Sequence, residues 1–106
     1  MALCPIGPLS RTSNEFEERL LDDIRSFLKK LAPADIGYQH NDIPLRDCPQ
    51  NEPENAHSHL MAMVLGSTES IPVVDGNLVL GTWQSVLFFE LDGPRKRQLR
   101  VQITGH

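Results

Sequence analysis

Apolar residues recur every three to four positions in the first third of the chain, a spacing that predicts an amphipathic helix ending near Leu31. The stripe consists of Phe16, Leu20, Leu21, Ile24, Phe27, Leu28 and Leu31. Thr12 with Glu15 three residues later forms a capping box at its start, and Pro33 follows its end. Residues 1–13 show no such period, so we expect an extended or loose lead-in there.

A second apolar segment predicts another helix between Asn51 and Gly66. Asn51 and Glu54 form a second box-like pair, Pro53 suits a first helical turn, and Gly66 is placed to end the helix. Between the two helices, residues 34–50 have no clean period. A stretch of this length without regular structure in a compact domain usually serves a function.

The remainder of the chain is rich in β-formers and predicts antiparallel strands. The expected strands are residues 71–74, 77–80, 82–91 and 98–104. Asp75 and Gly76 form a signal for a two-residue type I′ hairpin between the first two. The last strand alternates strictly between apolar and polar residues. Four short antiparallel strands after two helices predict an α+β fold.

Size and composition limit the classes of function. A chain of 106 residues predicts one domain spanning residues 1–106. Its 40% apolar and 23% charged residues are typical of globular proteins. A net charge of −4 disfavours nucleic acid as a partner, since such binders usually carry a positive field. Neither a signal peptide nor a membrane-length apolar run is evident, so we expect no membrane partner and a cytoplasmic location.

Histidines gather around the stretch between the helices. His40 is followed by Asn41 and Asp42, and His57 and His59 come early in the second helix. Imidazole and carboxylate suit zinc or another divalent ion. On a helix, however, positions two apart point about 200° apart, so His57 and His59 are not expected to share one ion. Helical phase places His57 inside the apolar arc and His59 at its margin, where it can face a cleft.

The same residues have structural interpretations. Asn41 and Asp42 are typical of turns and caps, and His57 is equally well explained as a core or interface histidine. A basic cluster near the end of the chain could either bind phosphate or form a solvated turn. Its members are Arg95, Lys96, Arg97 and Arg100. Trp83 predicts a core or interface aromatic, and Gln84, on the opposite strand face, could meet a ligand.

Several motifs, in order and without large gaps, resemble the YjbQ-like family. They are HND (40–42), NAHSHLMAMVLGS (55–67), IPVVDGNLVLGTWQ (71–84), DGPRKR (92–97) and VQITG (101–105). Members are often labelled secondary thiamine-phosphate synthases. The resemblance implies a sandwich or jelly-roll-like sheet and a homotrimer with a polar pocket near the histidines. The implied reaction joins a pyrimidine diphosphate to a thiazole phosphate and releases pyrophosphate.

The resemblance also assigns roles by position. His40, Asp42 and His59 are the implied catalytic residues. Side-chain chemistry, rather than the resemblance, makes His40 and His59 candidate ligands of a divalent ion, magnesium or zinc. The implied ligand-binding residues, which would contact a phosphorylated small molecule, are Asn41, His57, Gln84, Arg95 and Arg97. The family's N-terminal strands, with their His-Thr-Ser or His-Thr-Thr segment, are not recognisable in residues 1–13. We therefore expect a truncated or divergent domain, and the alternative function is non-catalytic, oligomeric binding of a phosphorylated metabolite or metal.

Overall fold

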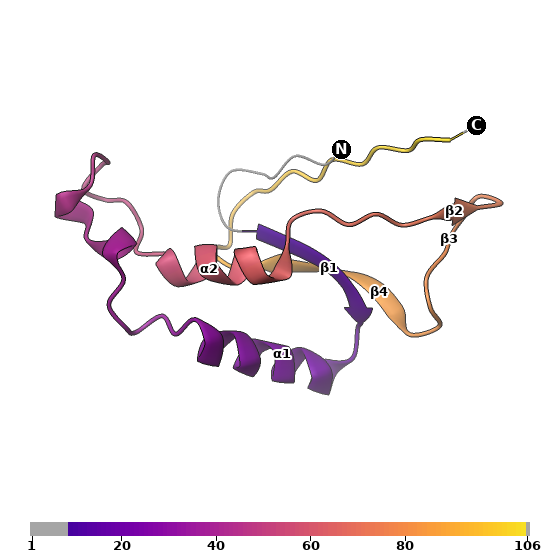
Figure 1. The fold of residues 1–106 in the computed structure, drawn as a ribbon, viewed down its shortest axis with the longest axis horizontal. Coiled ribbons are helices and arrows are strands. Elements are labelled where there is room, and N and C mark those ends of the chain that lie inside the picture. The colour runs from indigo at the N-terminus through magenta and orange to yellow at the C-terminus, as the bar shows by residue number, and fades with distance from the viewer. Residues whose placement is uncertain (1–8, 106) are drawn as a thin grey trace.

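The computed structural model describes the backbone of residues 9–105 and the side chains of residues 14–105. Its elements, labelled in Figure 1 where there is room, are β1 (Leu9–Glu15), α1 (Glu18–Leu31), the 3₁₀ turns η1 (Gln39–Asn41) and η2 (Ile43–Leu45), α2 (Ala56–Leu65), β2 (Val73–Val74), β3 (Asn77–Leu78) and β4 (Gln84–Glu90). Two helices with antiparallel strand pairs confirm the predicted α+β fold class.

Helix α1 starts directly after Glu17, which caps it. The Glu17 carboxylate accepts hydrogen bonds from the backbone N–H groups of Arg19 and Leu20, at 2.8 and 2.7 Å. The helix ends at Leu31, as predicted, with two lysines near the negative end of its dipole. The predicted cap at Thr12 is wrong, because that residue lies in strand β1.

Strand β1 includes residues 9–13 of the segment expected to be an extended or loose lead-in. It pairs antiparallel with β4 along its whole length, from Leu9 opposite Glu90 to Glu15 opposite Gln84. The capping box predicted here is local, whereas β1 is formed by hydrogen bonds to a segment far along the chain. Long-range pairing therefore overrides the local signal. The rest of the predicted lead-in, residues 1–8, lies outside the described residues.

Helix α2 begins at Ala56, later than the predicted start near Asn51. The side-chain oxygen of Asn41 accepts a hydrogen bond from the backbone N–H of Ala56 at 3.1 Å. A side chain from a separate loop thus accepts a hydrogen bond from a free N–H group at the helix start, in place of the local capping pair predicted there. The end is as predicted, because Gly66 has a φ of +80° and its N–H bonds to the carbonyl of Ala62 at 2.9 Å.

Strands β2 and β3 form the predicted hairpin. Val73 lies opposite Leu78 in an antiparallel pair. Asp75 and Gly76 have φ values of 50° and 76°, and a type I′ turn requires positive φ at both of these positions. The two-residue turn prediction is therefore confirmed.

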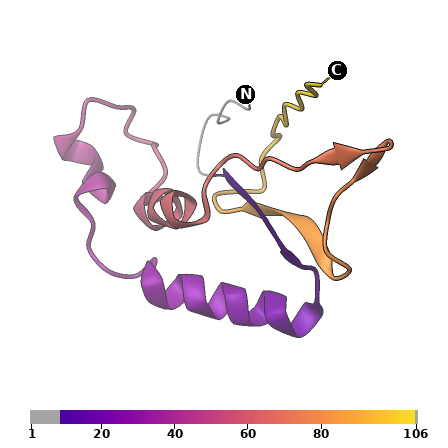
Figure 2. The ribbon, with the colours of Figure 1, turned by 45° about the vertical axis from the view of Figure 1, so that its right-hand side comes forward.

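The strand predicted for residues 98–104 is wrong. This segment has no strand partner among residues 9–105 and runs away from the helices and sheets (Figures 1 and 2). Val101 and Ile103 are 77% and 81% exposed. Alternation of apolar and polar residues describes a suitable strand surface, but a strand also needs a neighbour for its backbone hydrogen bonds.

The core lies where α1, α2 and the end of β4 meet. Leu28 of α1 and Met61 of α2 are 4% and 8% exposed and pack together with the buried Ala32. Partly buried side chains around them are Ile24, Leu65, Phe89 and Leu91. Figure 2 looks along α2, with α1 below it and the β1–β4 pair beside it.

Within residues 9–105, none of the helices combines the length and the apolar character that crossing a membrane requires.

Candidate functional site

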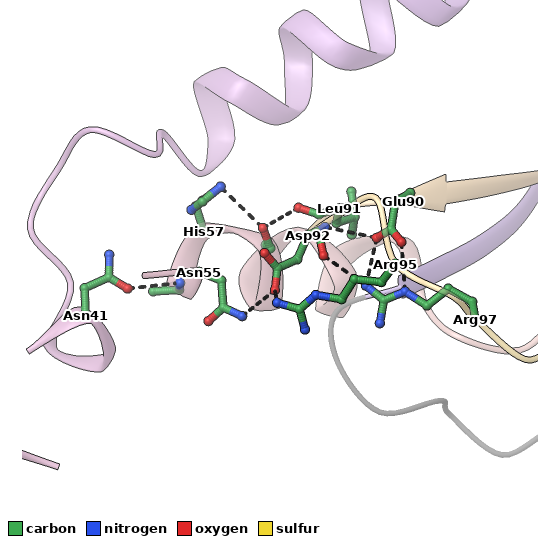
Figure 3. Close-up of polar contacts among 10 residues, drawn as sticks. Asn41, Asn55, His57, Glu90, Leu91, Asp92, Arg95 and Arg97 are labelled. Atoms are coloured by element: carbon green, nitrogen blue, oxygen red, sulfur yellow. Dashed lines mark hydrogen bonds and ion pairs between the residues drawn. The ribbon is translucent and has the colours of Figure 1, made fainter. Parts of the chain in front are cut away.

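Three chain segments meet at the N-terminus of α2 and form what we call the polar corner, residues 39–46, 55–59 and 90–97. Asn41 joins the first segment to the second through its bond to Ala56. Asn55 joins the second to the third, because its Nδ2 donates to Oδ2 of Asp92 at 2.6 Å (Figure 3). The Ser58 hydroxyl donates to the carbonyl of Leu91. Side chains from distant parts of the sequence are therefore held in register.

His40 and His59 come together in this corner. Their ring centroids are 5.0 Å apart and the ring planes are inclined by 80°, an edge-to-face arrangement. His40 is half-buried in η1, whereas His59, on the first turns of α2, is the more exposed of the two and only partly covered by its neighbours. Asn41 directly follows His40, and Ala56 comes three residues before His59. The hydrogen bond between Asn41 and Ala56 therefore helps to set the distance between the two rings.

His59 has a perturbed pKa. Partial burial is the main cause that lowers it, and the nearby His40 and Arg46 lower it further, while Asp92 raises it. The net effect is a pKa below the ordinary value of 6.5. The neutral imidazole, which accepts a proton or offers a lone pair, is therefore favoured at neutral pH.

Asp92 is a residue of the corner that its sequence context does not mark as a candidate. Its side chain is 17% exposed. Its carboxylate forms an ion pair with Nη2 of Arg95 at 2.9 Å and also accepts the hydrogen bond from the side-chain amide of Asn55. Its place in the motif DGPR suggests a turn residue, which conceals its contact with α2. Asn55 was missed for a similar reason, because its local sequence gives no indication of a partner 37 residues away.

Arg97 is engaged by a carboxylate of its own turn. Its Nε and Nη2 donate to Oε1 and Oε2 of Glu90, both at 2.8 Å, and Nη2 also reaches the carbonyl of Asp92 at 3.2 Å. The Arg97 side chain is only 9% exposed. Hydrogen bonding from this guanidinium lowers the pKa of Glu90 to about 2. The pair closes the turn after β4 (Figure 3).

The other predicted site residues lie differently. Asp42 is exposed, and its carboxylate makes no hydrogen bond or ion pair with any residue in the range 14–105. Gln84 begins β4, so the length of that strand separates it from Glu90 by about 20 Å. The structure therefore does not bring Gln84 to the polar corner or to the histidines. Its Oε1 instead accepts from the N–H of Gly81 at 3.0 Å.

His57 faces inward, as its helical phase predicts. It lines an apolar groove between α1, α2 and β4 together with Met61 and Leu87. Its Nε2 is 3.3 Å from the hydroxyl of Ser58, and its Nδ1 is buried without a hydrogen-bond partner among the described residues. His57 and His59 thus point to different surroundings.

The fit of a metal ion follows from the side chains present. Among residues 14–105, no group of three or more His, Cys, Asp or Glu side chains is arranged to hold an ion. His40 and His59 offer two imidazoles, whereas a catalytic zinc usually has three protein ligands. The described residues do not by themselves complete a metal site.

The fold and the corner define a class: an α+β protein whose histidine pair lies at the start of its second helix beside arginine–carboxylate pairs. Residues 10–106 match the family described as UPF0047 protein YjbQ-like. The chain belongs to this family, which confirms the resemblance noted in its motifs.

Relatives and solved structures agree with this assignment. The chain is 48% identical over 92 residues to the UPF0047 protein of Methanothermobacter thermautotrophicus, covering 87% of this chain and 58% of that relative. It is similar to the crystal structure of an uncharacterized yjbq/upf0047 family protein from Clostridium acetobutylicum, with 34% identity, a TM-score of 0.80, and coverage of 97% of this chain and 72% of that one.

A second solved structure is that of a YbjQ-like protein of unknown function from Sulfolobus solfataricus P2. It shares 35% identity with a TM-score of 0.73, and the match covers 91% of this chain and 64% of that one. The chain therefore has the family's fold while spanning 58% of the length of the Methanothermobacter relative.

Proposed function

We propose that this chain acts on a phosphorylated small molecule as a thiamine-phosphate synthase-like transferase, with His40 and His59 at the centre of its site. The observation that carries the proposal is the contact between these two rings, 5.0 Å apart, which come from separate elements. Two imidazoles beside arginine side chains at a helix start provide several N–H donors. Such donors suit phosphate oxygens.

The reaction needs little covalent help from the protein. The C–O bond of the pyrimidine diphosphate breaks and its electron pair leaves with pyrophosphate, while the thiazole nitrogen uses its lone pair to form the new C–N bond. The protein's task is to hold the diphosphate and stabilise the charge that develops on it. His40 and His59 would donate hydrogen bonds or exchange a proton with the leaving group. Asp42, two residues after His40, would orient one of the histidines.

The direct test is an assay for thiamine phosphate from the two phosphorylated substrates, comparing the parent protein with His59→Ala. We expect turnover to fall by about 10²- to 10⁴-fold, the range typical of a lost acid–base group. Arg19→Gln, on the exposed surface of α1, is the matched control and should keep full activity. Equal turnover in the parent protein and His59→Ala would remove the assigned role.

A non-catalytic role as a binding protein is the second candidate. Arg95 and Arg97, the residues expected to neutralise phosphate, are already paired with Asp92 and Glu90. This pairing reduces the positive charge available for a leaving group and favours binding without turnover. Thermal-shift measurements with phosphorylated compounds would support this candidate if stabilisation occurs without product, because ligands of the native state raise its stability.

The homotrimer belongs to the same proposal. Trp83 is 75% exposed and Phe88 is 47% exposed, and apolar surfaces of this kind commonly mark protein contacts. The Cα radius of gyration is 16.5 Å, whereas a compact chain of this length has about 13 Å. The chain is thus more extended than a compact monomer of its length, which supports contacts with other copies. Light scattering coupled to gel filtration tests the assembly, and a monomeric mass would contradict it.

A further inference from the structure

Arg46 lies beside the histidine pair, six residues after His40, although the sequence analysis assigned it no role. It ends the 3₁₀ turn η2, where its backbone N–H bonds to the carbonyl of Ile43 at 3.1 Å. Its Nη1 donates to the carbonyl of His40 at 2.9 Å. The backbone and the guanidinium are thus both anchored within one short loop. The side chain is half-buried rather than extended into solvent.

The arginines of the polar corner differ in their counter-ions. Arg95 and Arg97 have carboxylate oxygens at 2.9 and 2.8 Å, from Asp92 and Glu90. Within residues 14–105, by contrast, Arg46 forms no ion pair, and its one hydrogen-bond acceptor is the uncharged carbonyl of His40. A guanidinium has five N–H donors in a planar fork, so most of its capacity remains for another group.

The position of this charge relates it to His59. The Arg46 guanidinium is near enough to lower the pKa of His59, while its own contact is with His40. A partly desolvated cation beside two imidazoles is stabilised by a bound anion, because burying a charge without a partner is unfavourable. A phosphate group satisfies the fork with two parallel hydrogen bonds.

We infer that Arg46 is the phosphate-binding arginine of this site and that its ligand is a phosphate or diphosphate group, while Arg95 and Arg97 maintain the turn after β4. The inference deepens the proposed function by naming the residue that holds the anion, and its ligand class rests on that proposal. It does not require that any reaction follows. A binding experiment therefore tests it separately from catalysis.

The experiment measures the affinity of the full chain for inorganic pyrophosphate by isothermal titration calorimetry. Three substitutions are compared with the parent: Arg46→Ala, Arg46→Lys, which keeps the charge but loses the fork, and Arg46→Gln, which keeps a donor but loses the charge. We expect Arg46→Ala to weaken binding by about ten- to a hundredfold, the effect of losing hydrogen bonds to a charged group. Lysine should restore part of the affinity and glutamine little of it.

Arg19→Gln makes the same change in net charge on the exposed surface of α1 and should alter the affinity by less than about twofold. Circular dichroism melts establish that each variant is folded. If Arg46→Ala does not fold, the lysine and glutamine variants decide the question. Unchanged affinity in the folded Arg46 variants would overturn this inference alone. Absence of pyrophosphate binding by the parent would overturn both it and the proposed function.

Discussion

The polar corner and the C-terminal segment, residues 98–105, show two different ways in which a sequence pattern meets its surroundings. In the corner, Asn41, Asn55 and Asp92 find partners in other segments at 2.6–3.1 Å. In the C-terminal segment, an equally regular pattern leaves Val101 and Ile103 77% and 81% exposed. A polar side chain specifies its partner by hydrogen-bond geometry, whereas an alternating apolar face only requires that some surface cover it.

Strand β4 combines a covered and a partly uncovered apolar face within one element. Leu87 faces the helices and is 4% exposed. Val86 and Phe88, on the other face, are 43% and 47% exposed. A strand that is apolar on both faces is usually covered on both, as in a sheet between two layers. Among the described residues, Val86 and Phe88 are thus only partly covered, whereas Leu87 is packed against the helices.

The largest effect expected from this comparison is in the core. Leu28→Ala should reduce the free energy of unfolding by about 2–5 kcal/mol, because it removes a buried side chain and leaves a cavity. Ile103→Ala, in the exposed C-terminal segment, should change it by less than about 0.5 kcal/mol. Urea unfolding followed by circular dichroism measures both. Comparable losses would show that Ile103 is covered in solution and that the contrast between the regions does not hold.

A smaller effect is expected at the turn after β4. Glu90→Gln leaves the nearly buried Arg97 without its carboxylate and should cost about 1–3 kcal/mol at neutral pH. The pKa of Glu90 is lowered to about 2 from an ordinary 4.5. Its contribution is therefore complete above about pH 4.5 and is lost as the pH falls toward 2.

Urea midpoints between pH 2 and 7 test the sign of this dependence. The stability of the parent should fall more steeply below pH 4.5 than that of Glu90→Gln, so the two curves converge in acid. Lys96→Gln, in the same turn, serves as the matched control. Parallel curves for the parent and Glu90→Gln would contradict the role of this ion pair.

The smallest effect is expected from the cap that joins the loop to α2. Asn41→Ala should cost about 1 kcal/mol, the usual contribution of a helix cap, while Asn41→Asp keeps an acceptor and should cost less. Urea unfolding measures the loss. Cross-relaxation between the His40 and His59 ring protons measures whether the rings separate. Rings that stay in contact in Asn41→Ala would show that other bonds of the corner suffice to hold them.

Local signals predicted the parts of the fold that depend on neighbouring residues. The stripe of α1 and its end at Leu31, the stop of α2 at Gly66, and the hairpin turn at Asp75 and Gly76 all depend on local backbone preference or on which residues share a face. Strand β1 was not predicted, because it is stabilised by pairing with β4 and its own sequence lacks a strand pattern. The composition of a segment says little about a partner some seventy residues away.

The candidate site also has one part that local sequence predicted and another that only tertiary contacts set. The residue types of His40 and His59 identified candidates for acid–base or phosphate chemistry, and helical phase put His59 at the margin of the apolar arc of its helix, where the structure leaves it exposed. The pairing of arginines with carboxylates was not predictable, since Glu90 and Arg97 gave no local sign that each would neutralise the other. Because Arg95 and Arg97 are paired with carboxylates, Arg46 becomes the better candidate for binding an anion.

By itself, the sequence determined the family, the α+β class and the two helices, because these follow from motifs and from the period of apolar residues along one segment. Only the tertiary structure decided that the His40 and His59 rings meet, that Asn41 caps a helix from a distant loop, and that Asp92 lies against α2. The physical reason is that these contacts join segments whose separation is set by packing. No local preference encodes the distance between them.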